Sequence, residues 1–544
     1  MKKSVSLLLA VCMTFSLVAC AKTNDSQKSS NSSSDSGGTE AYVDVVGNPA
    51  PGGIATTTAK EEFTFGMLGE PMSLDPPTSR DATTPTGWLF HSQLYDTLLR
   101  YDAQTQQFHP VLATEWEIND DVTEVLFTLR EGVKYHCGET MTADDVVWSL
   151  TRALEAGYTD ALNDAIDHFE KVDETHIKVV LKYAYVPILQ VLTVPCWGVV
   201  CPHDVQKCEA NGSDFGRNPC GTGAYKFATW ESGKQLTFDA FEDYWEGVPA
   251  IKKVTSTILG DASAGALALE EGLIDYFPSV ATSDIQHLST LDNLHVEILP
   301  GTAIVAICMN STDGVFSDVR VRQAVSYAVN REDILTGAKN GNGSLAYCYC
   351  APMCVGYDAE FQANEQNIEK AKQLLAEAGY PDGLTVTCQQ DSSATYMPVA
   401  EVVQAQLKDI GINLEFDKME RTTWMDVVSV NRQFDITVRQ STYSIFDADY
   451  MLTRRLHSKN IGVGGNYSGY ANPKLDEVLD AARTEPDAVK RQALYTEAYA
   501  IVRDDAPMIP LLYTASPQIT NVNLRGMMDD ASWRDLWSRL YFIR

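Results

Sequence analysis

Residues 384–439 read LTVTCQQDSSATYMPVAEVVQAQLKDIGINLEFDKMERTTWMDVVSVNRQFDITVR. Three runs rich in β-branched and apolar residues, at 384–389, 412–416 and 434–439, are typical of strands. Between them, 399–410 and 422–431 have the pattern of helices. Strands that alternate with helices in this way predict an α/β domain with a largely parallel sheet.

Strand and helix patterns also alternate over the rest of the chain after residue 60, without short repeats or low-complexity segments. This argues against a solenoid or a propeller. Further strands are expected at 62–67, 126–130, 177–182 and 235–241, and further helices at 141–156, 319–329, 367–378, 474–482 and 488–504. Thr142 is positioned to cap the first of these helices with Asp145 as its partner, and Gly379 is positioned to end the third.

The first twenty residues, MKKSVSLLLAVCMTFSLVAC, have the basic start and short apolar core of a secretory signal peptide. Leu17-Val18-Ala19-Cys20 resembles a bacterial lipobox, which implies cleavage before Cys20 and attachment of lipid to its sulfur. The alternative is an ordinary signal peptide with a chance cysteine. Residues 21–60 are dominated by Ser, Asn, Gly, Thr and Pro, so we expect a flexible tether there.

The chain of 544 residues carries 42 Lys and Arg against 73 Asp and Glu, a net charge of −31. This excess of acid argues against a general nucleic-acid binder, which needs a basic surface to displace counterions. No stretch after the signal peptide has the length and apolarity of a membrane-spanning helix. We therefore expect the globular part to be soluble.

Six segments in one order together resemble the family 5 extracytoplasmic solute-binding proteins, the peptide- and nickel-binding components of ABC transporters. They are LGEPMSLDP (68–76), NPCGTGAYKF (218–227), YWEGVP (244–249), FSDVRVRQA (316–324), NYSGYANP (466–473) and PMIPL (507–511). Each segment alone also has a structural reading, for example a tight turn at Gly221-Thr222-Gly223. Together they indicate the architecture and leave the ligand open.

The resemblance implies an α/β fold of the type II periplasmic-binding-protein clamshell, with two lobes and an extra domain inserted in the first lobe. By that analogy lobe I takes residues 61–90, 222–303 and 515–544, the inserted domain takes 91–221, and lobe II takes 304–514. The chain would cross between the lobes near 304–309 and 511–516, where short or apolar residues suit strands that bend as a hinge.

The resemblance also implies one wall of a ligand cleft, along the strand that follows Phe434-Asp435. Asp447-x-Asp449 matches an Asp-Pro-Asp element of the family, with Ala448 in place of the proline. Peptide binders carry an acid for the peptide ammonium three positions earlier, and a Trp before it; here those positions are Ser444 and Ser441. The predicted ligand-binding residues are Gly69, Glu70, Arg439, Ser441, Tyr443, Ser444 and Asp447.

Ser444 offers a hydroxyl where a buried ammonium needs a charged partner, because an unpaired buried charge is costly. A free amine is therefore either not recognised here or is bound by another acid, such as Glu70 or Asp447. Arg439 is a candidate for binding a ligand carboxylate bidentately. The alternative for Arg439 is a position at the sheet edge, paired with a surface acid.

Ten cysteines remain once Cys12 is lost with the signal peptide and Cys20 is lipidated, and they include clusters at 196–220 and 348–354. Disulfides within or between these loops are the favoured interpretation for an exported protein. Free thiols in an anaerobe and a metal site are the alternatives, and neither cluster has the paired CxxC spacing of a zinc site. His457 follows the predicted cleft segment and is the one histidine that is a candidate for ligand binding. The alternative is a histidine on the surface.

These features predict a lipid-anchored, extracytoplasmic receptor that captures a small peptide or peptide-like solute for the permease and ATPase of an ABC importer. The alternatives are a binding protein of the same fold for an oligosaccharide or a metal chelate, or a signalling receptor. A secreted hydrolase has no support, because GxSxG, HExxH and a complete SxxK set are absent from the sequence. No catalytic residue, metal ligand or cofactor is predicted.

Overall fold

The computed structural model describes residues 54–156, 163–393, 395–462, 465–527 and 536–544. The predicted signal peptide, Cys20 and most of the tether lie outside the described residues. Ala55 is fully buried and donates its backbone N–H to the carbonyl of Ser538. The packed structure thus begins a few residues before the end of the predicted tether.

A four-stranded sheet has the order β1-β10-β9-β8, and its β1 and β10 are parallel. Its strands are β1 (Glu62–Met67), β8 (Tyr225–Glu231), β9 (Gln235–Ala240) and β10 (Lys253–Ile258). Helix α1 (Pro85–Leu94) covers it, and the rings of Phe65, Phe90 and Phe238 surround Trp537 from the C-terminal segment. The last residues of the chain therefore complete the first core.

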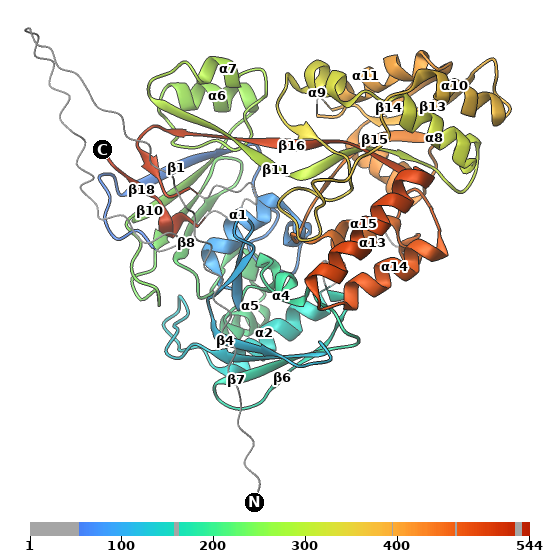
Figure 1. Cartoon of the computed structure of the whole chain (residues 1–544). Helices are drawn as coiled ribbons and strands as arrows, with labels where there is room; N and C mark the ends of the chain where they lie inside the picture. The colour runs from blue at the N-terminus through green and yellow to red at the C-terminus, as the bar shows by residue number, and fades with distance from the viewer. Residues whose placement is uncertain (1–53, 157–162, 394, 463–464, 528–535) are drawn as a thin grey trace, which may run out of the picture. The chain divides into compact units, whose positions relative to one another are not determined.

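The stretch from 384 to 439 forms the parallel part of a six-stranded sheet ordered β12-β16-β11-β15-β13-β14 (Figure 1). Strand β13 (Leu384–Asp391) is parallel to both β14 (Ile412–Met419) and β15 (Ile436–Thr442), as the β-α-β-α-β pattern predicted. Helix α11 (Met397–Lys408) packs its apolar side on this sheet. The predicted helix 422–431 forms as α12 (Arg421–Trp424), followed by a π-helical turn at Met425–Val430.

Two long antiparallel strands, β11 (Leu294–Met309) and β16 (Met508–Asn521), pair along almost their whole length. Their register shifts between Pro300 and Ile304, where a side chain on Gly301 would lie within 2.2 Å of Thr514. Tyr276 bridges β16 to β1, so these strands connect the four-stranded sheet with the six-stranded sheet. The register shift lies beside the predicted hinge.

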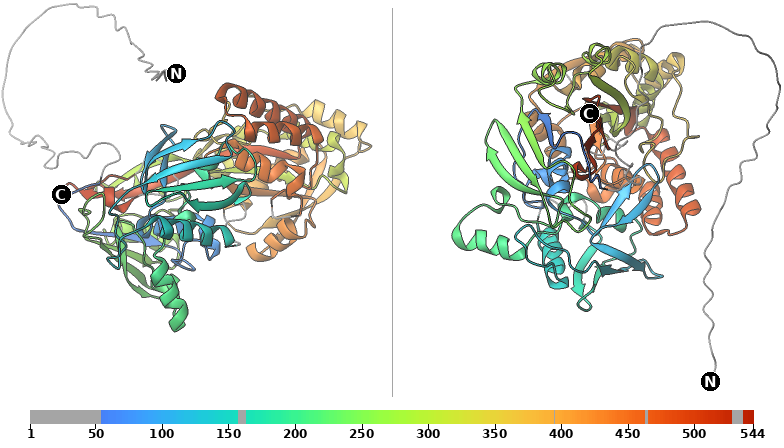
Figure 2. Two further views of the ribbon diagram at one scale, coloured as in Figure 1. Left: turned by 90° about the horizontal axis from the view of Figure 1, so that it is seen from below. Right: turned by 90° about the vertical axis from the view of Figure 1, so that its left-hand side faces the viewer.

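A second four-stranded sheet, β4-β5-β7-β6, is entirely antiparallel. Its strands are β4 (Ala113–Ile118), β5 (Glu124–Leu129), β6 (Ile166–Lys171) and β7 (His176–Leu181), drawn in blue to cyan in both views of Figure 2. Helix α2 (Ala143–Glu155) begins at the predicted capping box of Thr142 and Asp145. All these elements lie in the stretch predicted as the inserted domain.

The remaining elements are short strands and peripheral helices. The strands are β2 (Leu99–Asp102), β3 (Gln107–Pro110), β12 (Ser344–Leu345), β17 (Leu524–Arg525) and β18 (Tyr541–Phe542). The helices are α4 (Ile188–Val191), α5 (Pro202–Asn211), α6 (Ala262–Glu270), α7 (Ile285–Leu288), α8 (Val319–Ala328), α9 (Arg331–Lys339), α10 (Ile368–Glu377), α13 (Ala448–Leu456), α14 (Pro473–Thr484) and α15 (Ala488–Asp505). None of the described helices combines the length and apolarity that a membrane crossing requires.

Candidate ligand-binding site

Strand β15 carries the predicted cleft wall through the middle of the six-stranded sheet, between β11 and β13. Side chains alternate along a strand, so Arg439 and Ser441 share one face while Gln440 and Thr442 share the other. Arg439 pairs across the sheet with Ala306 of β11. The position of Arg439 is therefore central, and the sheet-edge interpretation is wrong.

Arg439 is buried among aromatic rings, with 4% of its surface exposed. Its guanidinium carbon lies 3.7 Å from the ring centroid of Tyr467 and 5.4 Å from that of Trp424. Its Nε and Nη1 are buried and have no hydrogen-bond partner within the described part of the chain. Within that part Arg439 forms no ion pair with a carboxylate, so the interpretation as a surface salt bridge is also wrong.

Two further arginines, from helix α13, bring positive charge to the same place. Arg455 is buried, and its guanidinium carbon lies 4.7 Å from the ring centroid of Tyr467. Arg454 donates a hydrogen bond to the hydroxyl of Tyr450. Burial alone would raise the pKa of Tyr467, but the charges of Arg455, Arg439 and Arg454 lower that pKa to about 7. The pKa of this phenol thus reflects a strongly positive local potential.

Several buried polar groups lie around Arg439 and Arg455. Ser441 lies beside Tyr349, and both are buried. Burial raises the pKa of the Tyr349 phenol, and the charges of Arg455 and Arg439 oppose that rise. Arg455 Nε and the Tyr443 hydroxyl are buried without a hydrogen-bond partner among the described residues. Because buried polar groups in folded proteins almost always have partners, such a group marks a place where a ligand or water belongs. We call Arg439, Arg455, Tyr467, Ser441 and Tyr349 the arginine site.

Ser444, which was predicted to stand where peptide binders carry an acid for the ammonium group, faces a tyrosine. Its hydroxyl is 2.8 Å from the hydroxyl of Tyr450, which also accepts a hydrogen bond from Arg454. The surroundings of Ser444 are therefore positive, and they suit an anion better than an ammonium group.

Asp447 was predicted as an alternative partner for a ligand amine, but its carboxylate is already engaged. Arg491 binds it with both Nη atoms at 2.8 Å, and Tyr495 donates to it at 3.1 Å. Asp447 also caps α13 by accepting from the backbone N–H of Asp449. The structure thus gives Asp447 a role in packing α13 against α15, and does not leave its carboxylate free for a ligand.

The carboxylate of Glu70, in the loop that follows β1, also has partners already. It accepts hydrogen bonds from Trp230 Nε1 at 2.6 Å, Ser232 Oγ at 2.6 Å and the backbone N–H of Gly233 at 3.1 Å. The bonds from Ser232 and Trp230 lower the pKa of Glu70. This network closes the β8–β9 turn. Gly69 beside it is exposed, and a Cβ added there would meet open space.

The opposite face of β15 borders a cavity of about 300 Å³. Gln440 and Thr442 line it together with residues of the crossing strands, and Lys339 is the charged residue of its lining. Burial lowers the pKa of Lys339. The volume is at the lower end for a small-molecule site, but this lining lacks the convergent charged groups of the arginine site.

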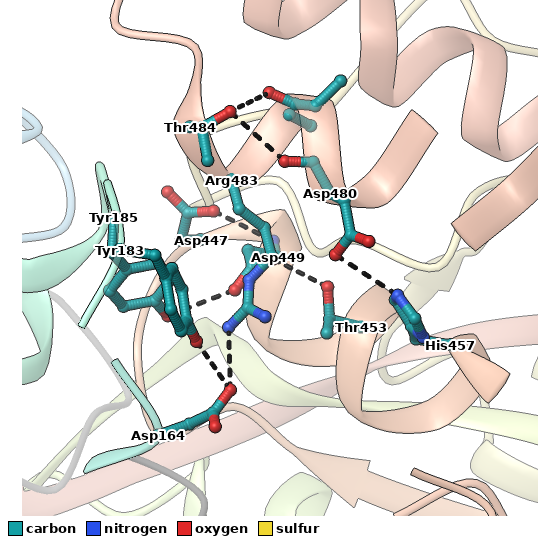
Figure 3. A network of polar contacts seen from close by, with 12 residues as sticks. Asp164, Tyr183, Tyr185, Asp447, Asp449, Thr453, His457, Asp480, Arg483 and Thr484 are labelled. Atoms are coloured by element: carbon teal, nitrogen blue, oxygen red, sulfur yellow. Dashed lines mark hydrogen bonds and ion pairs between the residues drawn. The ribbon is translucent and has the colours of Figure 1, made fainter. Parts of the chain in front are cut away.

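A polar cluster connects the predicted inserted domain to the predicted second lobe (Figure 3). Tyr185 donates from its hydroxyl to Asp449 Oδ2 at 3.1 Å, and Arg483 Nε lies 3.1 Å from Oδ1 of the same carboxylate. The rings of Tyr183 and Tyr185 lie 5.5 and 5.0 Å from the guanidinium of Arg483. Asp449 is thus a structural contact between the two parts.

His457 and the cysteines also depart from the predictions. His457 is 5% exposed and lies 3.3 Å from each of Asp476 and Asp480 of α14, so the surface position is wrong. The ten cysteines among the described residues are all free thiols, where disulfides were favoured. Three of them, Cys137, Cys201 and Cys220, lie close together.

Comparison with known proteins identifies the family. Residues 107–463 match the bacterial extracellular solute-binding proteins, family 5 (middle region). The chain belongs to this family. As a family 5 solute-binding protein it is a component of ABC transporters and not an enzyme.

Relatives of this family 5 protein match it over most of their length. It is 27% identical to the oligopeptide-binding protein AppA of Bacillus subtilis, over 96% of each chain. It is 29% identical to the glutathione-binding protein GsiB of Salmonella typhimurium, over 76% of this chain and 82% of that one. The periplasmic binding protein DppA of Helicobacter pylori, solved with the peptide STSA, matches with a TM-score of 0.78 and 24% identity, over 90% of this chain and 99% of that one. The α/β type II clamshell predicted from the sequence is thereby confirmed.

Arg455, Tyr467 and Tyr349 of the arginine site, and Trp424 beside it, were not predicted from the sequence. Tyr467 was visible as part of the family segment at 466–473, but its closeness to Arg439 was not. The adjacent arginines Arg454 and Arg455 could have indicated the site, because they follow the predicted cleft segment closely and add positive charge near it.

Proposed function

We propose that this chain is the lipid-anchored receptor of an ABC importer, and that it captures an anionic peptide or peptide-like solute and delivers it to the permease. One observation carries the proposal: the buried guanidinium of Arg439 has no carboxylate partner in the described part of the chain. The relatives whose names specify oligopeptides and glutathione support the ligand class.

Burial of the charge on Arg439 is unfavourable unless a partner compensates it. Removing an unpaired guanidinium from water costs several kcal/mol, even where aromatic rings offset part of that cost. A ligand carboxylate that accepts bidentate hydrogen bonds from Arg439 would recover it, with Arg455 as a second cation. The arginine site is therefore best suited to a ligand carboxylate.

Cationic ligands find no free acid among the predicted ligand-binding residues. Ser444 replaces the acid that would pair with a peptide ammonium, and the carboxylates of Asp447 and Glu70 already have partners. We therefore propose that this protein recognises its ligand by a terminal carboxylate or by acidic side chains. Main-chain groups at strand edges could hold the rest of an extended peptide.

The proposed domain arrangement follows the predicted boundaries. Lobe I comprises 61–90, 222–303 and 515–544, the inserted domain 91–221, and lobe II 304–514. The paired strands β11 and β16 support a hinge beside their register shift. The mature protein would be held outside the cytoplasm by lipid on Cys20 and would meet the permease and ATPase there.

Calorimetry with defined pools of ligands tests the proposal. We expect heat from acidic peptides and glutathione, and none from a basic-peptide pool, a sugar pool or Ni²⁺. Arg439→Ala should weaken binding by about 2–5 kcal/mol, which is roughly 30-fold to several thousand-fold.

Gln440→Ala, one residue away on the opposite face of β15, is the matched control and should bind within about threefold of the native protein. A loss of affinity in Gln440→Ala with none in Arg439→Ala would move the ligand to the cavity on the other face. Heat from sugar or Ni²⁺ alone would overturn the peptide assignment.

A further inference from the structure

Three cysteine thiols and one carboxylate converge in the part of the chain predicted as the inserted domain. Their ligand atoms, the sulfurs of Cys137, Cys201 and Cys220 and a carboxylate oxygen of Asp204, all lie within 4.8 Å of one another. Cys201 and Cys220 are buried, Asp204 is half-buried and Cys137 is exposed. The cluster is therefore mostly enclosed, with one side toward solvent.

The spacing of the sulfurs matches metal coordination. The sulfurs of Cys137 and Cys201 are 3.8 Å apart. With Zn–S bonds of about 2.3 Å, a tetrahedral site places its thiolate sulfurs about 3.8 Å apart. Zinc also accepts carboxylate oxygen as a ligand, so Asp204 completes a set of four.

The backbone holds these residues in place independently of their side chains. Cys201 donates its backbone N–H to the carbonyl of Cys220 at 2.9 Å, and Val200 forms a β-bridge with Gly221. Cys201 is also the N-cap residue of α5, where the helix dipole favours a thiolate. The three segments are thus already arranged for a shared ligand.

A neighbouring ion pair lies next to the cluster. Glu139 Oε2 is 3.9 Å from the sulfur of Cys201 and 2.6 Å from Nδ1 of His203. Groups of this kind commonly orient the ligands of a metal from outside its coordination shell.

We propose that Cys137, Cys201, Cys220 and Asp204 form a structural site for a thiolate-preferring divalent cation, Zn²⁺ in the first place. On binding, three thiols each release one proton and form three metal–sulfur bonds, and the ionised Asp204 supplies the fourth bond. The metal would tie the loop after β5, the start of α5 and the loop before β8 together. With four protein ligands the site is closed, as in structural zinc sites, and it is separate from the ligand site on β15.

Metal analysis of the full chain, isolated without reductant or chelator, tests the site. After dialysis against equimolar Zn²⁺, the native protein should retain about one zinc per chain, and Co²⁺ in its place should give an intense thiolate-to-cobalt charge-transfer band. Cys137→Ser and Asp204→Asn should each weaken zinc retention at least tenfold. Cys137 is exposed, so its replacement should leave the fold intact.

Cys208→Ser is the matched control, since Cys208 lies on the same helix α5 outside the cluster, and it should retain zinc like the native protein. A chelator should lower the unfolding temperature of the native protein and of Cys208→Ser, and leave that of Cys137→Ser unchanged. A disulfide between two of the three clustered cysteines by peptide mapping, or equal zinc retention in Cys137→Ser, would overturn the proposal.

Discussion

The guanidinium carbon of Arg439 lies over the ring of Tyr467, 3.7 Å from the ring centroid, and both side chains are buried. A desolvated cation–π contact contributes about 2 kcal/mol or more. An unpaired buried charge costs several kcal/mol, so the ring offsets only part of the cost. A ligand with a negative charge would compensate the rest of this cost by pairing with Arg439.

Affinity for an acidic ligand should fall as the pH rises above about 7. Arg455, Arg439 and Arg454 lower the pKa of Tyr467 to about 7 against the effect of burial, so above that pH its phenolate neutralises part of the site. A ligand anion then requires Tyr467 to take up a proton, which costs up to about tenfold in affinity per pH unit. Calorimetry between about pH 6 and about pH 9 measures this slope.

Tyr467→Phe is the control for this pH dependence, because it keeps the ring and removes the titrating group. Its affinity should vary little over the same range, and an unchanged slope would contradict the assignment. The depressed pKa also stabilises the folded protein as the pH rises from about 7 toward 10, and this contribution is lost as the pH falls through about 7.

Arg439→Met should leave the ligand-free protein at least as stable as the native one, although it removes binding of acidic ligands. An apolar side chain of similar length carries no desolvation penalty for charge, so the exchange should be neutral or stabilising. Urea unfolding measures the change. A loss of more than about 2 kcal/mol would mean that Arg439 has a structural role.

Asp447→Ala should destabilise the protein by about 3–5 kcal/mol, because it leaves Arg491 buried without its carboxylate. Asp243→Ala is the control, since the pair of Asp243 with Lys134 is exposed on both sides and should contribute less than about 1 kcal/mol. Urea unfolding compares the two. A change of less than 1 kcal/mol in Asp447→Ala, with tight ligand binding lost, would return Asp447 to the ligand site.

Closure of the two lobes should depend on Tyr185. We expect small-angle scattering to give a smaller radius of gyration at saturating acidic peptide. Tyr185→Phe removes a hydrogen bond to Asp449 and should weaken binding by about 1 kcal/mol, roughly fivefold. Tyr183→Phe removes a bond to Asp164 within the predicted inserted domain and should bind normally. An unchanged radius with bound ligand would count against closure.

Lipid attachment should require Cys20. Labelled fatty acid should enter the full chain in a bacterial host and be absent from Cys20→Ala, because the thioether forms on that sulfur. Cys12→Ala, within the signal peptide, is the control and should still be labelled. Lipid that persists in Cys20→Ala would remove the anchor from the proposal.

Features that depend on residues close together in the chain could be predicted from the sequence. The parallel strands β13, β14 and β15 and the capping box of Thr142 and Asp145 followed from such local patterns. The serine at position 444, where peptide binders carry an acid, was predicted from the resemblance to the family. Strand alternation, helical spacing and capping act over a few residues, so their signals lie side by side in the chain.

Contacts between charged groups, and between thiols, could not be predicted, because they join segments that are far apart in the chain. Asp447 pairs with Arg491, which is 44 residues later in the sequence. Cys137 lies beside Cys201, which is 64 residues later. Arg439 meets Tyr467 and Arg455 and no acid within the described residues, although the chain has many acids. The physical reason is that charge pairing and metal geometry depend on distances of a few ångströms between segments that the packing of the sheets brings together.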